Sequence, residues 1–183
     1  MSRRAVPPPA RLFLSVIYRE EGRFEEARRR IAERVAPLER ASEIFAFDRT
    51  DYYEREMGRP LFRRFLVGDG ETPRDALPAV KVAAEAIELE LSEGGRRTVN
   101  IDPGLLSEEN VVLATGKNYG HRVYLGDGVF ADLTLVYGRK EGYRPLPWTY
   151  PDYASAAVRA FLEEARASLR EARRRGRECR PCG

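Results

Sequence analysis

The sequence predicts a single α/β (α+β) domain in which helices cover a mixed or antiparallel β-sheet. The chain has 183 residues, which suits one domain that buries its own apolar core. Short apolar runs, typical of buried strands, alternate with longer segments whose apolar residues recur at helical spacing. Hydrophobic residues make up 43% of the chain and charged residues 33%, as in soluble globular proteins.

The first half of the chain predicts the order strand, helix, strand, strand, helix, strand. Each helix is predicted from an apolar stripe with helical spacing, such as Phe24, Ala27 and Ile31 in the first. This is the split βαβ order of ferredoxin-like domains, so we expect a ferredoxin-like βαββαβ unit. The strands are expected at residues 11–18, 41–47, 61–67 and 96–102, and the helices at 23–38 and 76–91.

The second half of the chain extends this unit. It predicts a strand at 111–116, a β-hairpin at 121–137 and a long amphipathic C-terminal helix at 153–175. We therefore expect one folded unit with two extensions. These parts are a flexible proline-rich arm at 1–9, a single α/β domain at 10–169, and a basic tail at 170–183 that comprises the end of the last helix and then a disordered segment.

Positive charge is concentrated at the C-terminal end. The net charge is +3, while residues 170–183 contain six arginines and two glutamates, so residues 1–169 are almost neutral. Such a tail is usually solvated, but it can also bind phosphates, so RNA or another nucleic acid stays an alternative partner. No apolar run approaches the ~20 residues of a membrane span. The start MSRRAVPPPA lacks the apolar core of a signal peptide, so we expect a cytoplasmic protein.

The two cysteines of the chain, Cys179 and Cys182, form a lone CxxC near the C-terminus. A structural zinc ion needs four ligands, and a redox CxxC normally begins a helix. This pair therefore indicates neither kind of site.

Three scarce residues lie within five positions. Only three of the 32 basic residues are lysine, and Lys117 lies four positions before the single histidine, His121, with Asn118 between them. A lysine offers a compact ammonium where arginine offers a planar fork. We predict a site here, in which Lys117, Asn118, Arg122 and Tyr124 bind phosphate or substrate.

The hairpin at 121–137 is predicted to turn at Gly126-Asp127-Gly128, with Gly128 in the left-handed region and Leu125 opposite Val129. Arg122 then lies opposite Asp132, and we expect an ion pair between them. The register that this turn sets gives the hairpin one apolar face and one polar face. The apolar face comprises Val123, Leu125, Val129, Ala131, Leu133 and Leu135, and the polar face Arg122, Tyr124, Phe130, Asp132 and Thr134.

His121 falls on the apolar side of this hairpin or at its rim. Two interpretations remain open for it. It is either a neutral, hydrogen-bonded histidine at the edge of the sheet, or a residue that transfers a proton or binds phosphate.

Carboxylates cluster in residues 48–56. If this stretch is extended, Glu54 and Glu56 share a face about 7 Å apart, at ~3.3 Å per residue. Such a pair can hold Mg²⁺ or Mn²⁺ and leave positions open for substrate phosphates. The alternative is a solvated loop whose glutamates pair with Arg55, Arg63 or Arg64.

Two more polar groups lie near the ends of predicted elements, one at a strand and one at the last helix. Asn100 and Asp102 alternate onto one side of their strand, which makes Asn100 a candidate substrate ligand and Asp102 a candidate catalytic residue. Alternatively, Asp102-Pro103-Gly104 is an ordinary turn. Asp152 is well placed to cap the last helix, while the aromatics around it, Trp148, Tyr150 and Tyr153, can wedge that helix onto the sheet.

Four phrases, FDRTDYYEREMG, NIDPG, KNYGHRVYLGDG and WTYPDY, together resemble a bacterial and archaeal family, domain of unknown function 4416. The resemblance covers nearly the whole chain, and several motifs fall in order. It implies little chemistry, because the family has no established activity. Some members carry a GTP-binding label, but Val111 occupies the first glycine position of a P-loop frame here, which speaks against a P-loop NTPase.

The leading hypothesis is an enzyme or binding protein for a phosphorylated or nucleotide-like small molecule that uses a divalent metal. The sequence leaves open whether the chain is an enzyme. One alternative is an RNA-binding module that stacks bases on Tyr124 and Phe130 and uses the arginine tail. The other is an interaction protein without a ligand. Under the leading hypothesis, the predicted residues meet in one cleft: His121 and Asp102 as catalytic residues, Lys117, Asn118, Arg122, Asn100 and Tyr124 as ligands, and Glu54 and Glu56 at the metal.

Overall fold

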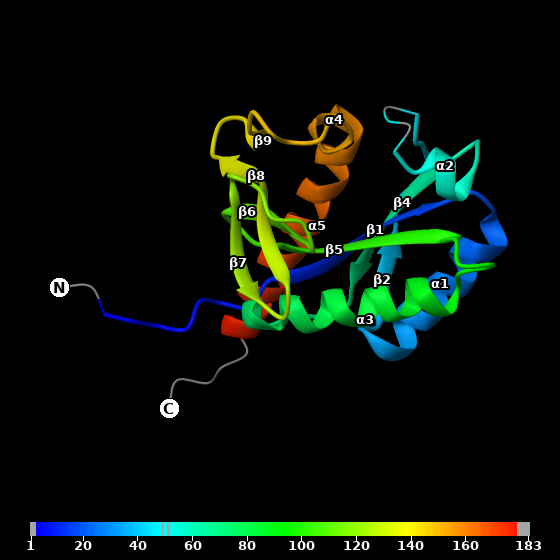
Figure 1. Ribbon diagram of the computed structural model, residues 1–183. Coiled ribbons are helices and arrows are strands. Elements are labelled where there is room, and N and C mark those ends of the chain that lie inside the picture. The colour runs from blue at the N-terminus through cyan, green and yellow to red at the C-terminus, as the bar shows by residue number, and fades with distance from the viewer. Residues whose placement is uncertain (1–2, 49, 51, 179–183) are drawn as a thin grey trace.

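The computed structural model describes residues 3–48, 50 and 52–178. In this part of the chain, nine strands form one antiparallel sheet with helices against it (Figure 1). A single α+β domain with an antiparallel sheet is thereby confirmed. The strands are β1 (Arg11–Tyr18), β2 (Leu38–Ala41), β3 (Phe45–Ala46), β4 (Phe62–Gly68), β5 (Val99–Leu106), β6 (Asn110–Thr115), β7 (Arg122–Gly126), β8 (Val129–Gly138) and β9 (Gly142–Pro145).

The strands follow the spatial order β2-β4-β1-β5-β6-β8-β7, with β3 also beside β4 and β9 beside β8. β1 lies between β4 and β5, and all eight of its residues are buried, as its continuous apolar sequence predicts. The sheet is larger than a four-stranded ferredoxin-like one, so that predicted order is not confirmed in detail. The strand β9 was not predicted.

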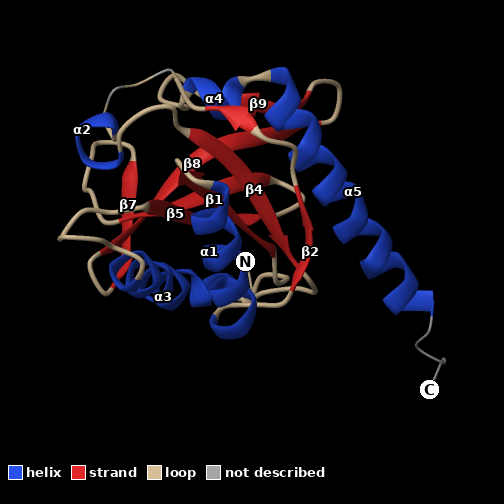
Figure 2. Cartoon of the chain, turned by 90° about the vertical axis from the view of Figure 1, so that its right-hand side faces the viewer, coloured by secondary structure: helices blue, strands red, loops and turns tan. Residues whose placement is uncertain are grey.

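Helices cover both faces of the sheet (Figure 2). Leu12, Leu14 and Val16 of β1 share one apolar core with α1 and α3. Phe13, on the opposite face of the same strand, belongs to the core under α5. This division follows from the alternation of side chains along a strand. The helices are α1 (Glu21–Arg34), α2 (Glu54–Met57), α3 (Leu77–Glu90), α4 (Pro151–Ala154) and α5 (Ala156–Glu178).

Two predicted elements are each divided in the structure. The strand expected at 41–47 is replaced by the short strands β2 and β3, and Leu38, assigned to the first helix, begins β2. Pro37 explains the early end of α1, because residues before a proline disfavour helical geometry. The last helix is likewise interrupted at Ser155, whose ψ of 147° is extended.

The hairpin pairing is confirmed in part. Arg122 lies opposite Asp132, and Gly128 has a φ of 75°. The predicted turn is wrong, because Gly126 pairs with Val129 and the register shifts between Tyr124 and Gly126. A two-residue turn with a bulge therefore replaces the three-residue turn, and Leu125 is not opposite Val129.

The predicted faces of the hairpin are also wrong. Val123 is 66% exposed, because β7 is the last strand of the sheet, while Asp132 and Thr134 are buried. The segment before α4 covers the polar side: Trp148 Nε1 donates to Leu133 O at 2.8 Å, and Thr149 Oγ1 donates to Thr134 O.

β5 continues through Pro103 and Gly104, so the turn expected at Asp102-Pro103-Gly104 is wrong. β6 pairs with β5 only from Gly104 onward, so the missing N–H of Pro103 interrupts no pairing on that side. A Cβ built on Gly104 would lie 2.5 Å from Phe13 Cζ and 2.8 Å from Val112 O. Gly104 is therefore required by the close approach of a ring and a neighbouring strand.

We expect Gly104→Ala to lower the free energy of unfolding by about 1–3 kcal/mol, the usual cost of forcing extra atoms into a packed core. Urea denaturation measures this loss. Gly22→Ala is the matched control, since nothing lies within 4 Å of its Cβ position in α1 and alanine favours a helix. Equal stability of the two variants would contradict the packing argument.

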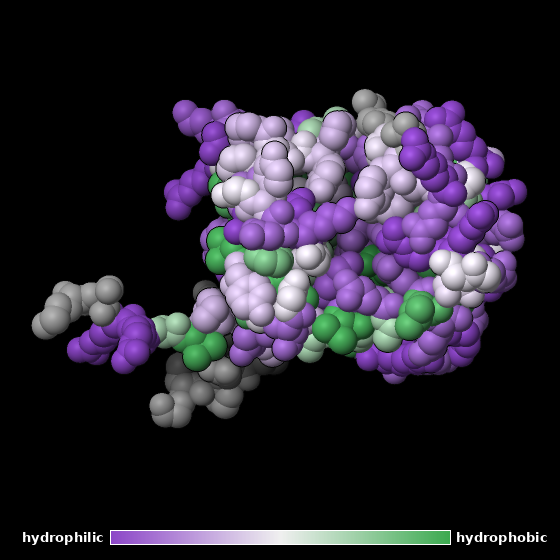
Figure 3. Space-filling model, in the orientation of Figure 1, coloured by the Kyte–Doolittle hydropathy of each residue, from purple (hydrophilic) through white to green (hydrophobic). Residues whose placement is uncertain are grey.

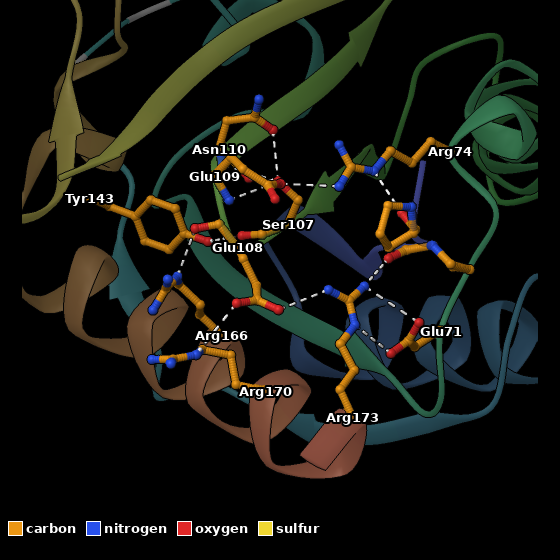
Figure 4. Close-up of polar contacts among 12 residues, drawn as sticks. Glu71, Arg74, Ser107, Glu108, Glu109, Asn110, Tyr143, Arg166, Arg170 and Arg173 are labelled. Carbon is orange, nitrogen blue, oxygen red and sulfur yellow. Dashed lines mark hydrogen bonds and ion pairs between the residues drawn. The ribbon is translucent and has the colours of Figure 1, made fainter. Parts of the chain in front are cut away.

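Arginines of α5 hold this helix against the β5–β6 turn (Figure 4). Arg166 Nε donates to Glu108 O at 2.9 Å, and Arg173 contacts Glu108 at 3.0 Å and Glu71 at 2.8 Å. Arg74, which precedes α3, donates to Pro8 O in the N-terminal arm at 2.9 Å. Arg173 belongs to the predicted basic tail, so part of that charge stabilises the docked helix.

The C-terminal pair Cys179 and Cys182 lies outside the described residues. Among the residues that are described, no helix combines the length and the apolar character that a membrane crossing requires.

Candidate functional site

A cavity of about 590 Å³ opens where the central strands, the start of the hairpin and the helices α3 and α4 meet. Residues from β4, β5 and β6, from the β6–β7 connection, from α3 and from α4 line it. From the side shown in Figure 1, hydrophilic residues gather between the hairpin and α2 (Figure 3). This volume lies within the range of small-molecule sites, about 300–1,000 Å³.

Four of the predicted site residues line this cavity: Asn100, Asp102, Lys117 and Arg122. Asn100 and Asp102 pair with alternate residues of β1, Ile17 and Ser15, so both side chains lie on the same face of the sheet. The cavity therefore brings together motifs from β5, from the β6–β7 connection and from β7.

His121 lies behind the cavity wall. Its Nε2 is 3.2 Å from Asp132 Oδ2, and its ring is stacked on Trp148 with the centroids 4.8 Å apart. Asp132 itself lines the cavity and is also bound by Arg122. His121 thus reaches the cavity through Asp132, and it does not line the cavity itself.

Two other predicted ligands lie elsewhere. Asn118 is exposed in the β6–β7 connection and does not line the cavity. Tyr124 is 60% exposed on the edge strand and packs on Phe130 with the ring centroids 5.2 Å apart.

The extended arrangement predicted for Glu54 and Glu56 is wrong, because both belong to helix α2. Arg97 donates to both carboxylate oxygens of Glu56, at 2.6 and 2.9 Å, and this bonding lowers the pKa of Glu56. Glu54 forms an ion pair with Arg59. Neither partner is one of those the sequence suggested. Within the described residues, no group of three or more metal-ligating side chains is present.

Lys117 and Arg122 form the basic side of the cavity. Lys117 Nζ lies 2.6 Å from Tyr52 Oη and 4.1 Å from the centroid of that ring. Across the described part of the chain, no carboxylate pairs with this ammonium. Arg122 differs, because its donors are used by Asp132 at 2.9 Å, by Lys117 O at 3.0 Å and by Tyr150 Oη at 3.1 Å.

A second polar cluster, contributed by α3 and β5, was not predicted as part of the site. Lys81 is 6% exposed, and its Nζ lies 3.3 Å from Asp102 Oδ1 and 3.3 Å from Ile101 O. Burial lowers the pKa of Lys81, but the carboxylates of Asp102, Glu88 and Glu85 outweigh it, so the pKa is raised. The ammonium is therefore charged and holds Asp102 in place.

Glu88, another cavity residue on α3, is 7% exposed. Its Oε1 accepts a hydrogen bond from the Ile101 N–H. Burial raises the pKa of Glu88 to about 7. A carboxyl that titrates near neutral pH inside a cavity is typical of functional sites. The signal in the sequence is weak: Lys81 and Glu88 interrupt the apolar face of a predicted helix.

The third cluster joins β4 to α4. Arg63 Nη1 donates to Asp152 Oδ2 at 2.8 Å, and its guanidinium lies over the rings of Phe47 and Tyr153 at 4.6 and 5.4 Å. The cap predicted for Asp152 is wrong, since Asp152 lies inside α4 and binds this arginine. Tyr153 is buried against Phe65, as a wedge between helix and sheet requires.

A family model described as Domain of unknown function (DUF4416) matches residues 8–169. The chain belongs to this family. The match confirms the resemblance seen in the sequence, and the DUF4416 region contains every residue that lines the cavity. No curated protein and no solved structure matches the chain.

Proposed function

We propose that this DUF4416 domain binds a phosphorylated, nucleotide-like small molecule in the cavity between β5, α3 and the hairpin. Lys117 carries the proposal. It places an ammonium at the cavity that no carboxylate in the described residues neutralises. A phosphate group would supply the missing negative charge.

The surroundings of Lys117 suit an organic phosphate. Gly116 lines the cavity beside Lys117 and leaves its backbone open to a ligand, with only Glu85 Oε1 near its Cβ position. The bond from Arg122 to the Lys117 carbonyl fixes the loop that carries the ammonium. Tyr52 and Tyr53 line the same cavity and offer aromatic surface to a planar group.

The two carboxylates predicted to bind a metal ion, Glu54 and Glu56, already have other partners. Glu56 accepts a bidentate bond from Arg97, and Glu54 pairs with Arg59, so neither carboxylate fits a metal ligand. The proposed ligand is therefore held by cations and polar side chains. The catalytic roles of Asp102 and His121 stay predictions. The role of Asp102 has more support, because Asp102 lines the cavity and His121 does not.

Nucleic-acid binding has less support. The exposed pair of Tyr124 and Phe130 fits base stacking. However, Arg173 and Arg170 of the predicted tail pair with Glu108, and Arg175 pairs with Glu171. These tail arginines are therefore engaged in ion pairs within the protein.

We expect Lys117→Ala to weaken the binding of adenosine 5′-monophosphate and inorganic phosphate about 10- to 100-fold, the usual value of a hydrogen bond to a charged group. Calorimetric titration measures the dissociation constants. Lys140→Ala is the matched control, because Lys140 is exposed after β8 and does not line the cavity. The proposal fails if the two lysine variants bind phosphate equally well. Salt-sensitive RNA binding without phosphate binding would favour the nucleic-acid alternative instead.

A further inference from the structure

Helix α3 presents three ionisable residues to the cavity. Lys81, Glu85 and Glu88 are spaced four and three residues apart, so they lie along one face of the helix. This face meets β5, where Asp102 and the Ile101 backbone contact it. Glu85, Glu88 and Asp102 therefore form an acidic side of the cavity, which includes Lys81. Its charge is opposite to that of the basic side formed by Lys117 and Arg122.

Most polar groups of this acidic side already have partners. A continuous chain of contacts runs from Glu56 through Arg97, Asn100 and Asp102 to Lys81. Its links are 2.6 Å between Glu56 and Arg97, 2.8 Å from Arg97 to Asn100, 2.8 Å from Asn100 to Asp102, and 3.3 Å from Lys81 to Asp102. These groups hold one another in fixed positions.

Glu88 is different. One of its carboxylate oxygens accepts the Ile101 N–H, and the other forms only a long ion pair with Arg97 Nη1 at 3.9 Å, beyond hydrogen-bond distance. In the part of the chain that the structure describes, this second oxygen accepts no hydrogen bond. Buried carboxylates normally accept hydrogen bonds, so an oxygen held only by this long ion pair beside a cavity points to a donor that arrives with a ligand.

The neighbours of Glu88 set its charge. Burial has the largest effect and raises its pKa to about 7, and Asp102 raises it further, while Lys81, the Ile101 N–H and Arg97 oppose this. From α3 and the start of α2, Glu85 and Tyr53 also face this cluster. Close to neutral pH the carboxyl therefore exists in both protonation states, and a bound donor favours the ionised one.

We infer that Glu88 recognises a hydrogen-bond donor, a hydroxyl or an amino group, on the ligand whose phosphate contacts Lys117, and that binding releases a proton from Glu88. This inference rests on the proposed function. It restricts the ligand to an organic phosphate that carries such a donor away from the phosphate. Inorganic phosphate satisfies Lys117 but supplies no such group to Glu88.

The test compares adenosine 5′-monophosphate with inorganic phosphate on the full chain, by calorimetric titration between pH 6 and pH 8. The wild type is compared with Glu88→Gln, because the titration of the phosphate itself is common to both proteins. We expect the affinity of the wild type for adenosine 5′-monophosphate to rise up to about tenfold more over this range than that of the variant. For inorganic phosphate, the two proteins should behave alike.

Glu43→Gln serves as control, because Glu43 is exposed and does not line the cavity. It should keep the full pH dependence of the wild type. Identical pH dependence of the wild type and Glu88→Gln would overturn the inference. If Lys117→Ala still weakens both ligands in that case, the proposed function stands alone. If neither ligand depends on Lys117, the proposed function fails and the inference falls with it.

Discussion

Asp132→Leu is expected to lower the free energy of unfolding by about 3–5 kcal/mol, the cost of leaving a buried charge without its partner. Asp132 is 3% exposed, and its Oδ2 accepts from Arg122 at 2.9 Å and lies 3.2 Å from His121 Nε2. The substitution leaves the buried guanidinium of Arg122 facing an apolar side chain. Urea denaturation near pH 7 measures the loss.

The double variant Arg122→Met, Asp132→Leu separates this effect from poor packing. Replacing a buried ion pair by apolar residues of similar volume is often close to neutral, so the double variant should recover most of the lost stability. A double variant as unstable as Asp132→Leu would show that shape, rather than unpaired charge, causes the loss. The wild type and Arg122→Met complete the cycle.

The pairing of Arg122 with Asp132 could be predicted because it depends on a short hairpin. Glycines mark the turn, and the number of residues between the two strands limits the register to a few possibilities. The bulge at Leu125 could not be predicted in the same way. The predicted register assumed that one face of the hairpin is buried, but β7 is the edge strand and leaves Val123 exposed.

Asn100 and Asp102 could also be placed on one side of a strand from their alternation alone. Their partners could not be predicted, because Arg97 meets Glu56 across 41 residues of sequence and Lys81 meets Asp102 across 21. Such contacts depend on which face of α3 and which end of α2 approach β5. The polar sequence around Glu56 fits a short helix as well as an extended loop, and contacts with Arg97 favour the helix.

The structure separates two residues that the sequence grouped together. Lys117 and His121 are four positions apart, yet only Lys117 lines the cavity, while His121 is stacked on Trp148. Trp148 reaches this position because its Nε1 donates to Leu133 O. A contact between residues 27 positions apart, fixed by a backbone carbonyl, leaves no local signal in the sequence.

Glu88→Gln is expected to stabilise the protein at pH 8 relative to the wild type. The pKa of Glu88 is about 7 in the folded protein, against about 4.3 for an unfolded glutamate. The folded state therefore binds the proton more tightly, so the contribution of Glu88 to stability is complete below about pH 4 and is lost as the pH rises through 7.

Well above pH 7 this loss amounts to about 4 kcal/mol, because each pKa unit corresponds to about 1.36 kcal/mol. Glutamine keeps an oxygen that can accept the Ile101 N–H, but it cannot ionise. Urea denaturation at pH 5 and at pH 8 should therefore show the stability difference shifting by about 2–3 kcal/mol in favour of Glu88→Gln at the higher pH. Glu43→Gln, at an exposed site, should follow the wild type at both. If the curves of Glu88→Gln and the wild type stay parallel from pH 5 to 8, Glu88 does not titrate in this range, and the carboxyl at the cavity is already ionised before any ligand arrives.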